Sequence, residues 1–364
     1  MGEQKAKTDE LFPIVSSTPK TAGAVSGIAR LASCGAAAGE GHLVEFRTLP
    51  ARSLLNNSVS RRGGWFSKTI NPYRGCEFGC RYCYARYTHE FMEMKDPADF
   101  ERKIYIKQNA AWLLRQELRS LRPGEEIALG TATDPWQPIE RRARVTRSIL
   151  EVLAEYRDLQ IGVVTKSTLI ERDIDLLQRI RERSRLVLHI TITTPDARLA
   201  RVLEPRAPRP DLRFRTVKRL RKAGLRTGIL CSPLMPGITD NAKALNAMCR
   251  LASGAGASFL SAQPLFLKPC SKATFLAFVH EHFPELDASY ASRYEAGAFV
   301  SKAYQRRISD LVAAVTRKYG LSPRFAEETS ARTPEPAQGE LWPSWPSKRE
   351  AHSAAVPQRV MRTS

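Results

Sequence analysis

Short runs of apolar residues alternate with longer amphipathic segments through the middle of the chain. The apolar runs predict strands, because strands buried inside a parallel sheet are short and almost continuously apolar. The segments between them repeat apolar positions every three or four residues, which predicts helices. The predicted strands are residues 66–70, 127–131, 160–165, 186–192, 226–232 and 258–263, and the predicted helices are 84–92, 143–156, 169–181, 211–223, 241–252 and 272–280.

This alternation of strand and helix predicts βαβ units and therefore an α/β fold built on a parallel sheet. About six such units predict a barrel or part of one, in which chemistry takes place on the loops after the carboxyl ends of the strands. Residues 103–107 predict a small extra strand, and residues 110–118 predict a helix after it. Residues 289–318 predict one long helix packed behind the sheet.

The two ends of the chain differ from its middle. Residues 1–42 are rich in small residues without sustained periodicity, which predicts a flexible tail with a short helix at 25–32. Residues 326–364 are rich in proline and small polar residues, which predicts a disordered tail. We therefore expect one core domain over 43–325, ending in a helical extension.

Composition narrows the class of protein. Hydrophobic residues make up 43% of the 364 residues, which is enough for a core. We find no apolar run of about 18 residues, the length that a membrane-spanning helix needs, and no secretory leader. The sequence thus predicts a cytoplasmic protein in a reducing compartment.

The chain is strongly basic, with 57 Lys and Arg against 37 Asp and Glu and a formal charge of +20. Such a charge attracts polyanions, so DNA or RNA is a candidate partner, although a merely solvated basic surface explains it equally well. Aromatic residues for base stacking are not interleaved with the basic residues, so stacking on single strands is not predicted. The basic residues of the predicted 211–223 helix are expected to form an outward stripe: Arg213, Arg215, Lys218, Arg219, Arg221 and Lys222.

Three cysteines form a C-x3-C-x2-C run at Cys76, Cys80 and Cys83. Thiolates crowded onto one loop are soft ligands, suited to zinc or to an iron–sulfur cluster. Three cysteines hold three irons of a cubane and leave the fourth iron open to a small molecule. Gly75 and Gly79 allow the loop to wrap tightly, because glycine tolerates backbone angles closed to other residues.

Two other interpretations of these cysteines remain open. Structural zinc needs four ligands, and His89 could complete a Cys3His site. Disulfides are disfavoured, because the cysteine count of seven is odd and we expect a reducing compartment. The pattern favours a cluster.

Polar residues follow several predicted strands, where the barrel rule places function. Thr131, Thr133 and Asp134 can hydrogen-bond an ammonium or a ribose, but Asp-Pro is also a common turn that starts a helix. Lys166 is a suitable carboxylate partner, because it carries a compact positive charge. Thr191 either faces the barrel interior or is a satisfied core threonine, and Tyr82 beside the last two cysteines could shield the site or stack on an adenine.

Taken together, four motifs resemble one family. They are N-P-Y-R-G-C-x3-C-x-Y-C-Y-A-R from residue 71, T-x-T-D-P-x-Q-P from residue 131, V-T-K-S from residue 164 and P-L-M-P-G from residue 233. In this order they resemble the spore-photoproduct-lyase-like subgroup of the radical S-adenosylmethionine (SAM) superfamily, over about residues 45–320.

This resemblance implies a fold, cofactors and a reaction class. The fold is a partial (β/α)6 TIM-type barrel with parallel strands. The cofactors are a [4Fe-4S] cluster on the three cysteines and SAM at the open iron. SAM is implied to contact Lys166 and Thr191, with its amino group at the end of the second strand. An electron donor such as flavodoxin or ferredoxin would drive reductive cleavage of SAM to a 5′-deoxyadenosyl radical, which abstracts hydrogen from a substrate.

The chain departs from the lyase pattern at one position. The lyase carries a hydrogen-donating cysteine at the end of its second strand, whereas this chain has Thr131-Ala132-Thr133 there. Cys231 could substitute as a catalytic residue, or it is an inert buried thiol. We therefore predict a lyase-like radical SAM enzyme whose exact reaction and substrate are unknown. The alternative is a nucleic-acid-binding module with a structural or redox-sensing cluster.

Overall fold

The computed structural model describes residues 27–41, 43–58, 66–122, 124–322 and 324. The chain divides into residues 1–324 and 325–364, and all described residues lie in the first unit. The predicted tail at 326–364 and most of the predicted tail at 1–42 lie outside the described residues. The domain boundaries at 43 and 325 therefore stay predictions.

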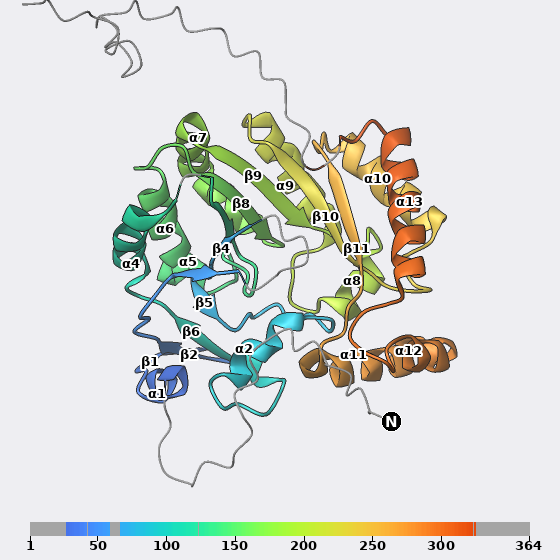
Figure 1. Ribbon diagram of the computed structural model, residues 1–364, viewed down its shortest axis with the longest axis horizontal. Helices are drawn as coiled ribbons and strands as arrows, with labels where there is room; N and C mark the ends of the chain where they lie inside the picture. The colour runs from blue at the N-terminus through green and yellow to red at the C-terminus, as the bar shows by residue number, and fades with distance from the viewer. Residues whose placement is uncertain (1–26, 42, 59–65, 123, 323, 325–364) are drawn as a thin grey trace, which may run out of the picture. The chain divides into compact units, whose positions relative to one another are not determined.

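A seven-stranded sheet forms the centre of the described part (Figure 1). Six of its strands are parallel and follow one another in sequence order, which confirms the predicted α/β fold. The sheet is open, with β3 at one edge and β11 at the other, so the barrel is partial. The strands are β3 (Leu55–Asn57, antiparallel to β4), β4 (Lys68–Ile70), β7 (Glu126–Leu129), β8 (Gln160–Thr165), β9 (Arg185–Thr191), β10 (Thr227–Leu234) and β11 (Leu260–Pro264).

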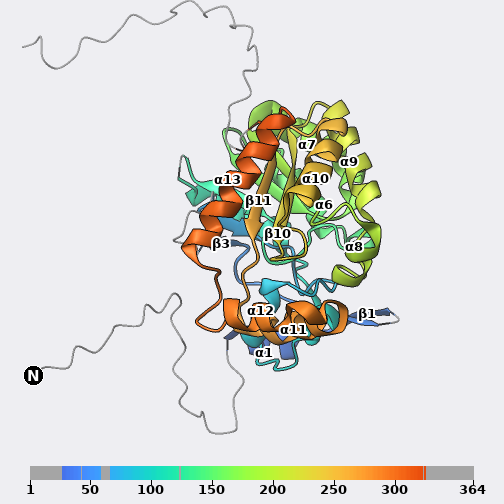
Figure 2. The same cartoon turned by 90° about the vertical axis from the view of Figure 1, so that its right-hand side faces the viewer.

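Helices connect these strands and bury their apolar faces against the sheet. In α6, for example, Ile149, Leu150 and Leu153 are fully buried, as expected for residues three and four positions apart. Figure 2 shows α7, α9 and α10 along one side of the sheet, and α13 beside the β11 edge. The connecting helices are α6 (Val145–Leu153), α7 (Ile174–Arg183), α8 (Ala197–Leu203), α9 (Pro210–Lys222) and α10 (Ala242–Gly254).

A second, four-stranded sheet has the order β1-β2-β6-β5. Two elements fall inside the segment predicted as a tail: α1 (Gly27–Ser33), which overlaps the short helix predicted at 25–32, and β1 (Ala37–Gly41), a strand of this sheet that was not predicted. The sequence gives no sign of β1, because Ala and Gly show no alternation, whereas its pairing with β2 provides the hydrogen bonds. The other strands are β2 (Val44–Thr48), β5 (Tyr73–Arg74) and β6 (Lys103–Ile106).

The single long helix predicted over 289–318 is wrong. The chain instead forms α12 (Asp287–Arg293) and α13 (Lys302–Lys318) with an extended break between them. Phe299 in the break pairs with Phe266 in a β-bridge, and the Ser301 side chain accepts a hydrogen bond from the Tyr304 amide to start α13. Tertiary pairing and a new N-cap therefore interrupt an otherwise helical pattern.

The remaining helices range from single turns to the 14-residue α11. Figure 1 shows α2 and α11 near the ends of the strands where β9 and β10 point. Within the described part, none of the helices is both long and apolar enough to cross a bilayer. These helices are η1 (Tyr84–Arg86), α2 (Tyr87–Glu90), α3 (Asp99–Arg102), α4 (Ala110–Glu117), η2 (Leu118–Ser120), α5 (Glu140–Ala143), η3 (Thr168–Asp173), α11 (Pro269–His282) and η4 (Pro284–Leu286).

Candidate cofactor site

The cysteine loop follows β4 and β5 and is fixed by contacts to the β6 region. Gly75 has φ +83°, and a Cβ on it would lie 2.8 Å from the carbonyl oxygens of both Lys103 and Phe100. The next residue, Cys76, donates its backbone N–H to Phe100 O at 2.9 Å. Only glycine permits this close approach and this backbone angle, so Gly75 determines where the first cysteine lies.

A buried glutamine clamps the same loop from the second-strand motif. Gln137 Nε2 donates to Gly75 O at 3.3 Å and to Thr133 Oγ1 at 3.1 Å, while Gln137 Oε1 accepts from Glu77 N at 2.9 Å. Thr133 Oγ1 itself donates to Gly75 O at 2.6 Å. The Glu77 side chain also bonds back to this motif region, because its Oε1 accepts a hydrogen bond from Ile139 N at 2.8 Å. The motif from residue 131 therefore holds the cysteine loop, a role that our sequence analysis missed.

Replacing Gln137 with Ala should loosen this loop. The change leaves the buried Glu77 amide without its acceptor, which costs about 1–3 kcal/mol of unfolding free energy. Urea denaturation of the metal-free protein measures this loss. Gln108→Ala is the matched control, because Gln108 is exposed and should stay within about 0.5 kcal/mol of the wild type. Equal stability of the two variants would contradict the clamp.

All three cysteines are free thiols, and Cys80 and Cys83 are near enough to Cys76 to raise its pKa. Burial raises the pKa of Cys76 and Cys83, and raises that of Cys80 to about 12. Lys166 lowers the pKa of Cys80, and Arg86 lowers that of Cys83, so cationic side chains already lie near the sulfurs. A metal cation would convert such thiols to thiolates. The donor set therefore fits an iron–sulfur cluster.

The predicted fourth zinc ligand, His89, is engaged elsewhere. Its Nε2 donates to Lys103 O at 3.0 Å, and its ring packs edge-on against Phe100 and Tyr105 at centroid distances of 5.3 and 6.0 Å. Zinc draws each ligand to about 2.0–2.3 Å. Within the described part of the chain, no group of three His, Cys, Asp or Glu side chains is already gathered as a metal site, which applies to the three cysteines as well and does not separate zinc from a cluster. The contacts of His89 therefore do not support the Cys3His alternative.

Lys166 places a positive charge beside the cysteine loop. Its Nζ lies 5.6 Å from the ring centroid of Tyr82, and among the described residues it has no hydrogen-bond or ion-pair partner. Burial lowers the pKa of Lys166, but the combined effect of Cys80 and Glu204 in raising it is larger. The pKa of Lys166 therefore lies above its ordinary value. The ammonium is therefore protonated and available to an anion.

A buried ion pair supports the other side of the loop. Arg213 Nη2 lies 2.6 Å from Glu204 Oε2, and Arg213 Nη1 donates to Thr191 O at 3.0 Å. Glu204 Oε1 accepts from the hydroxyl of Tyr82 and from Thr193 Oγ1, the latter at 3.0 Å. This network joins the predicted cofactor residues Tyr82 and Thr191 through Glu204, which our sequence analysis missed.

Asp134 accepts three hydrogen bonds from the protein. Its Oδ1 accepts from Thr165 Oγ1 at 2.7 Å and from Trp136 N at 3.0 Å, and its Oδ2 accepts from Lys166 N at 2.7 Å. These bonds tie the ends of β7 and β8 together and hold the Lys166 backbone in place. Thr131 also lies at this end, where its carbonyl accepts from Tyr84 OH. The roles of Thr131, Thr133 and Asp134 as SAM ligands stay predictions.

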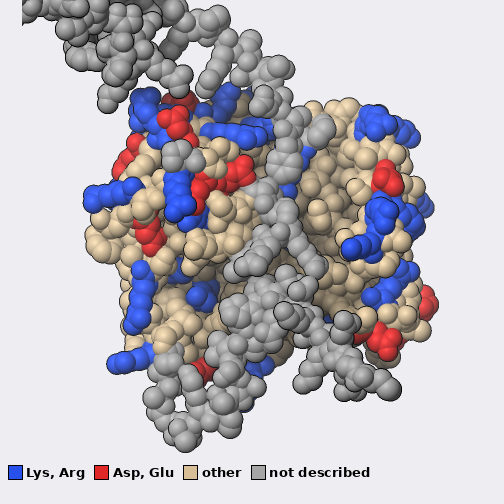
Figure 3. Space-filling view, viewed as in Figure 1, with Lys and Arg blue, Asp and Glu red and all other residues tan. Residues whose placement is uncertain are grey.

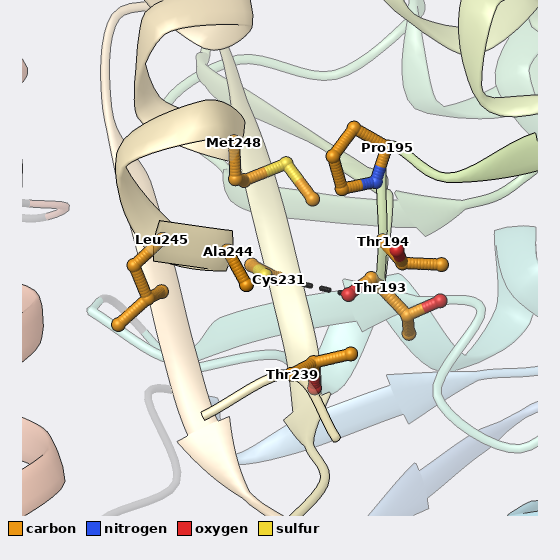
Figure 4. Close-up of a pocket in the computed structure, with 8 residues that line it drawn as sticks. All are labelled: Thr193, Thr194, Pro195, Cys231, Thr239, Ala244, Leu245 and Met248. Atoms are coloured by element: carbon orange, nitrogen blue, oxygen red, sulfur yellow. Dashed lines mark hydrogen bonds between the residues drawn. The ribbon is translucent and has the colours of Figure 1, made fainter. Parts of the chain in front are cut away.

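Cys231 lies on β10, outside the cysteine loop. Its Sγ is 3.8 Å from Thr193 O, and burial raises its pKa to about 12. These features favour the inert-thiol interpretation, while the hydrogen-donor role stays a prediction. Figure 4 shows the small pocket that it lines with Thr193, Thr194, Pro195, Thr239, Ala244, Leu245 and Met248.

The outward basic stripe predicted on α9 is partly wrong. Arg213 is only 1% exposed, because it pairs with Glu204 inside the protein. Arg219 pairs with Glu171, and Arg215 lies 3.3 Å from Asp211. On the face drawn in Figure 3, Lys and Arg are likewise interspersed with Asp and Glu rather than gathered in one patch. The stripe therefore carries less free charge than its sequence indicates.

Comparisons with known proteins agree with this site. A model of the radical SAM superfamily matches residues 70–246. An uncharacterized protein of Mycobacterium tuberculosis is 31% identical over 282 residues, 77% of this chain and 82% of its own length. An uncharacterized protein of Methanocaldococcus jannaschii is 28% identical over 171 residues, 47% of this chain and 61% of its own length.

Solved structures show the same fold. Spore photoproduct lyase complexed with dinucleoside spore photoproduct is 14% identical with a TM-score of 0.54, covering 75% of this chain and 79% of the lyase. A mutant of that lyase with bound SAM and the dinucleoside spore photoproduct is also 14% identical with a TM-score of 0.54, covering 81% of this chain and 85% of the mutant lyase. Since the radical SAM model matches residues 70–246, which include the cysteine loop and the strand ends that clamp it, the chain belongs to the radical SAM superfamily.

Proposed function

We propose that the protein holds a [4Fe-4S] cluster on Cys76, Cys80 and Cys83 and binds SAM next to it. The observation that carries this proposal is the protonated Lys166 ammonium beside the clamped cysteine loop, where it has no hydrogen-bond or ion-pair partner among the described residues. When bound, the cluster supplies the electron that splits SAM into methionine and a 5′-deoxyadenosyl radical, which abstracts hydrogen from the substrate.

The chain's own residues would bind and orient SAM. Lys166 would provide a charge-assisted contact for the SAM carboxylate, and the bond from its backbone N–H to Asp134 fixes the position of its backbone. Tyr82 is fixed by its hydroxyl bond to Glu204, and its ring covers one side of the ammonium. The burial of this network excludes water, which would otherwise compete for the ion contact and expose a radical to side reactions.

We further propose that the substrate is a nucleic acid and that an electron donor such as flavodoxin or ferredoxin supplies the reductant. The support is the charge of +20 and the structural likeness to a lyase solved with a dinucleoside. We propose a cytoplasmic location, for which the expected reducing compartment is the reason. The lyase's own reaction is not carried over, because Thr131-Ala132-Thr133 replaces its hydrogen-donating cysteine.

Lys166→Ala tests the proposal. In cluster-loaded protein it should weaken SAM binding roughly 10- to 150-fold, the value of a hydrogen bond to a charged group, and equilibrium dialysis measures this. Lys222→Ala is the matched control, because Lys222 is exposed on α9. Under strong reductant the wild type should form 5′-deoxyadenosine without added substrate. Cluster-loaded protein that left SAM intact would overturn the proposal and favour a binding module with a redox-sensing cluster.

A further inference from the structure

The end of α8 and the segment after it pack against the cysteine loop. Arg81, in the loop, donates its backbone N–H to Leu203 O at 2.9 Å. Arg206 donates its backbone N–H to Phe78 O at 3.3 Å. The Arg206 guanidinium lies against Gly79, because a Cβ built on this glycine would be 3.0 Å from Arg206 Nη2. Arginines from two distant parts of the chain therefore meet at the loop.

Two further arginines extend this group. Arg201 lies on α8, two positions before the residue whose carbonyl accepts from Arg81. Burial raises the pKa of Glu77 in the loop, whereas Arg206 and Arg142 act to lower it. A lowering of this kind requires a nearby positive charge, so Arg142 also lies near the loop. We call Arg81, Arg142, Arg201 and Arg206 the arginine patch.

The charge of the arginine patch is not neutralised by neighbouring carboxylates. Arg142 and Arg201 are exposed, and the other two members are partly exposed. Within the described ranges, none of the four has an ion-pair partner. The nearby Glu77 is only 8% exposed, and Glu101 pairs with Arg86 at 2.6 Å. The surface over the loop therefore presents unpaired positive charge.

The arginine patch lies one residue away from a proposed iron ligand. Arg81 directly follows Cys80, and Arg206 covers Gly79, which directly precedes Cys80. Consecutive Cα atoms are about 3.8 Å apart. Electron transfer through protein slows exponentially with distance. A reductant bound at this patch would therefore have a short path to an iron held by Cys80.

We propose that the arginine patch is the docking surface for an acidic one-electron carrier protein. Opposite charges steer such a carrier to the patch and fix its orientation. The carrier gives one electron to the iron–sulfur cluster and is itself oxidised by that electron, with no atom transferred. Nucleic acid fits the patch less well, because the neighbouring rings of Phe46 and Phe78 are buried and offer bases no stacking surface. This inference rests on the proposed cluster and adds where its electron arrives.

Binding of an acidic flavodoxin to the full chain, measured by isothermal titration calorimetry at low salt, tests the patch. Arg142→Glu with Arg201→Glu should weaken binding roughly 10- to 100-fold, because each change sets a like charge against the carrier. Lys218→Glu with Lys222→Glu is the matched control, because it lowers the net charge equally on exposed residues of α9. Since Lys222 lies just before β10, at the opposite end of the strands from the cysteine loop, the control should change affinity less than about 2-fold.

Two results of the binding measurement would overturn the patch. One is equal flavodoxin affinity of the two double variants, or no binding by the wild type. The other is a DNA duplex that binds the wild type more tightly than flavodoxin does and is lost in the Arg142→Glu, Arg201→Glu variant, which would assign the patch to nucleic acid. Arg142→Gln with Arg201→Gln should show a smaller loss in the same direction, and it replaces the charge reversal if unfolding midpoints show that the reversed variant is not folded.

A second measurement separates this inference from the proposed function. Dithionite is a small reductant that needs no docking surface. In the Arg142→Glu, Arg201→Glu variant, SAM cleavage driven by reduced flavodoxin should fall, relative to cleavage driven by dithionite, by roughly the factor lost in binding. An unchanged ratio of the two rates would overturn the patch while leaving the radical chemistry in place. Absence of cleavage with dithionite in the wild type would instead count against the proposed function.

Discussion

Replacing Cys76, Cys80 or Cys83 with Ala should abolish iron binding. The wild type, reconstituted anaerobically, should hold about four irons per chain with broad brown absorbance, as expected for a cubane on cysteine thiolates. Each variant should hold almost none, because the donor set contains three thiolates and losing one leaves two irons without a protein ligand. Iron and acid-labile sulfide assays, together with the visible spectrum, measure this.

Cys34→Ala is the control for this experiment. Cys34 is an exposed free cysteine outside the loop, so this variant should bind as much iron as the wild type. Cys231→Ala should also keep its iron, because Cys231 lies on β10, outside the cysteine loop. A colourless wild-type protein with stoichiometric zinc would contradict the proposed cluster and support the zinc-site interpretation.

Much of the sheet could be predicted because buried parallel strands leave a local pattern. Residues 160–165 were predicted as a strand, and β8 occupies the same six positions. β9 and β10 are also buried and largely apolar, and their predicted and observed bounds differ by one or two residues. The position of the cysteine loop at the strand ends followed from the order of the units.

Arg213 shows a local signal that we did not use. Arg213 lies four and seven positions before Val217 and Leu220, which are fully buried, so all three share one face of α9. The spacing alone placed this arginine toward the core. The outward stripe is therefore wrong at Arg213, although its partner Glu204 lies on another segment and is not visible from this spacing.

Other features had no local signal. Tyr82 meets Glu204 across 122 positions, and Gln137 meets Glu77 across 60. The break between α12 and α13 depends on a bridge to Phe266, which periodicity does not encode. Side-chain contacts of this kind require the folded arrangement, so the sequence could indicate the cysteine loop as a candidate metal site but not the residues that hold this loop in place.

Glu204→Ala should be among the most destabilising single changes in the protein. It leaves the guanidinium of Arg213, only 1% exposed, without its carboxylate. Breaking a buried ion pair by removing one partner costs about 3–5 kcal/mol, because the remaining charge is uncompensated. The hydroxyls of Tyr82 and Thr193 also lose their acceptor. Urea unfolding of the metal-free protein measures the loss.

Two comparisons separate the buried charge from simple truncation. Asp211→Ala removes the exposed partner of Arg215 and should cost less than about 1 kcal/mol, as for surface pairs. The double variant Glu204→Met with Arg213→Met removes both charges and should recover much of the stability lost by Glu204→Ala. A double variant less stable than Glu204→Ala would contradict the ion-pair explanation.

The pH dependence gives an independent test of the same pair. Burial raises the pKa of Glu204, but the combined effect of Arg213 and Lys166 in lowering it is larger. The pKa of Glu204 in the folded protein therefore lies below its ordinary value. The carboxylate therefore contributes stability that is fully present above the unfolded glutamate pKa of about 4.3. This contribution is lost as pH falls through the lower folded pKa. The stability gap between wild type and Glu204→Gln should be constant near neutral pH and narrow in acid. A gap that widened in acid would show that Glu204 is buried as the neutral acid.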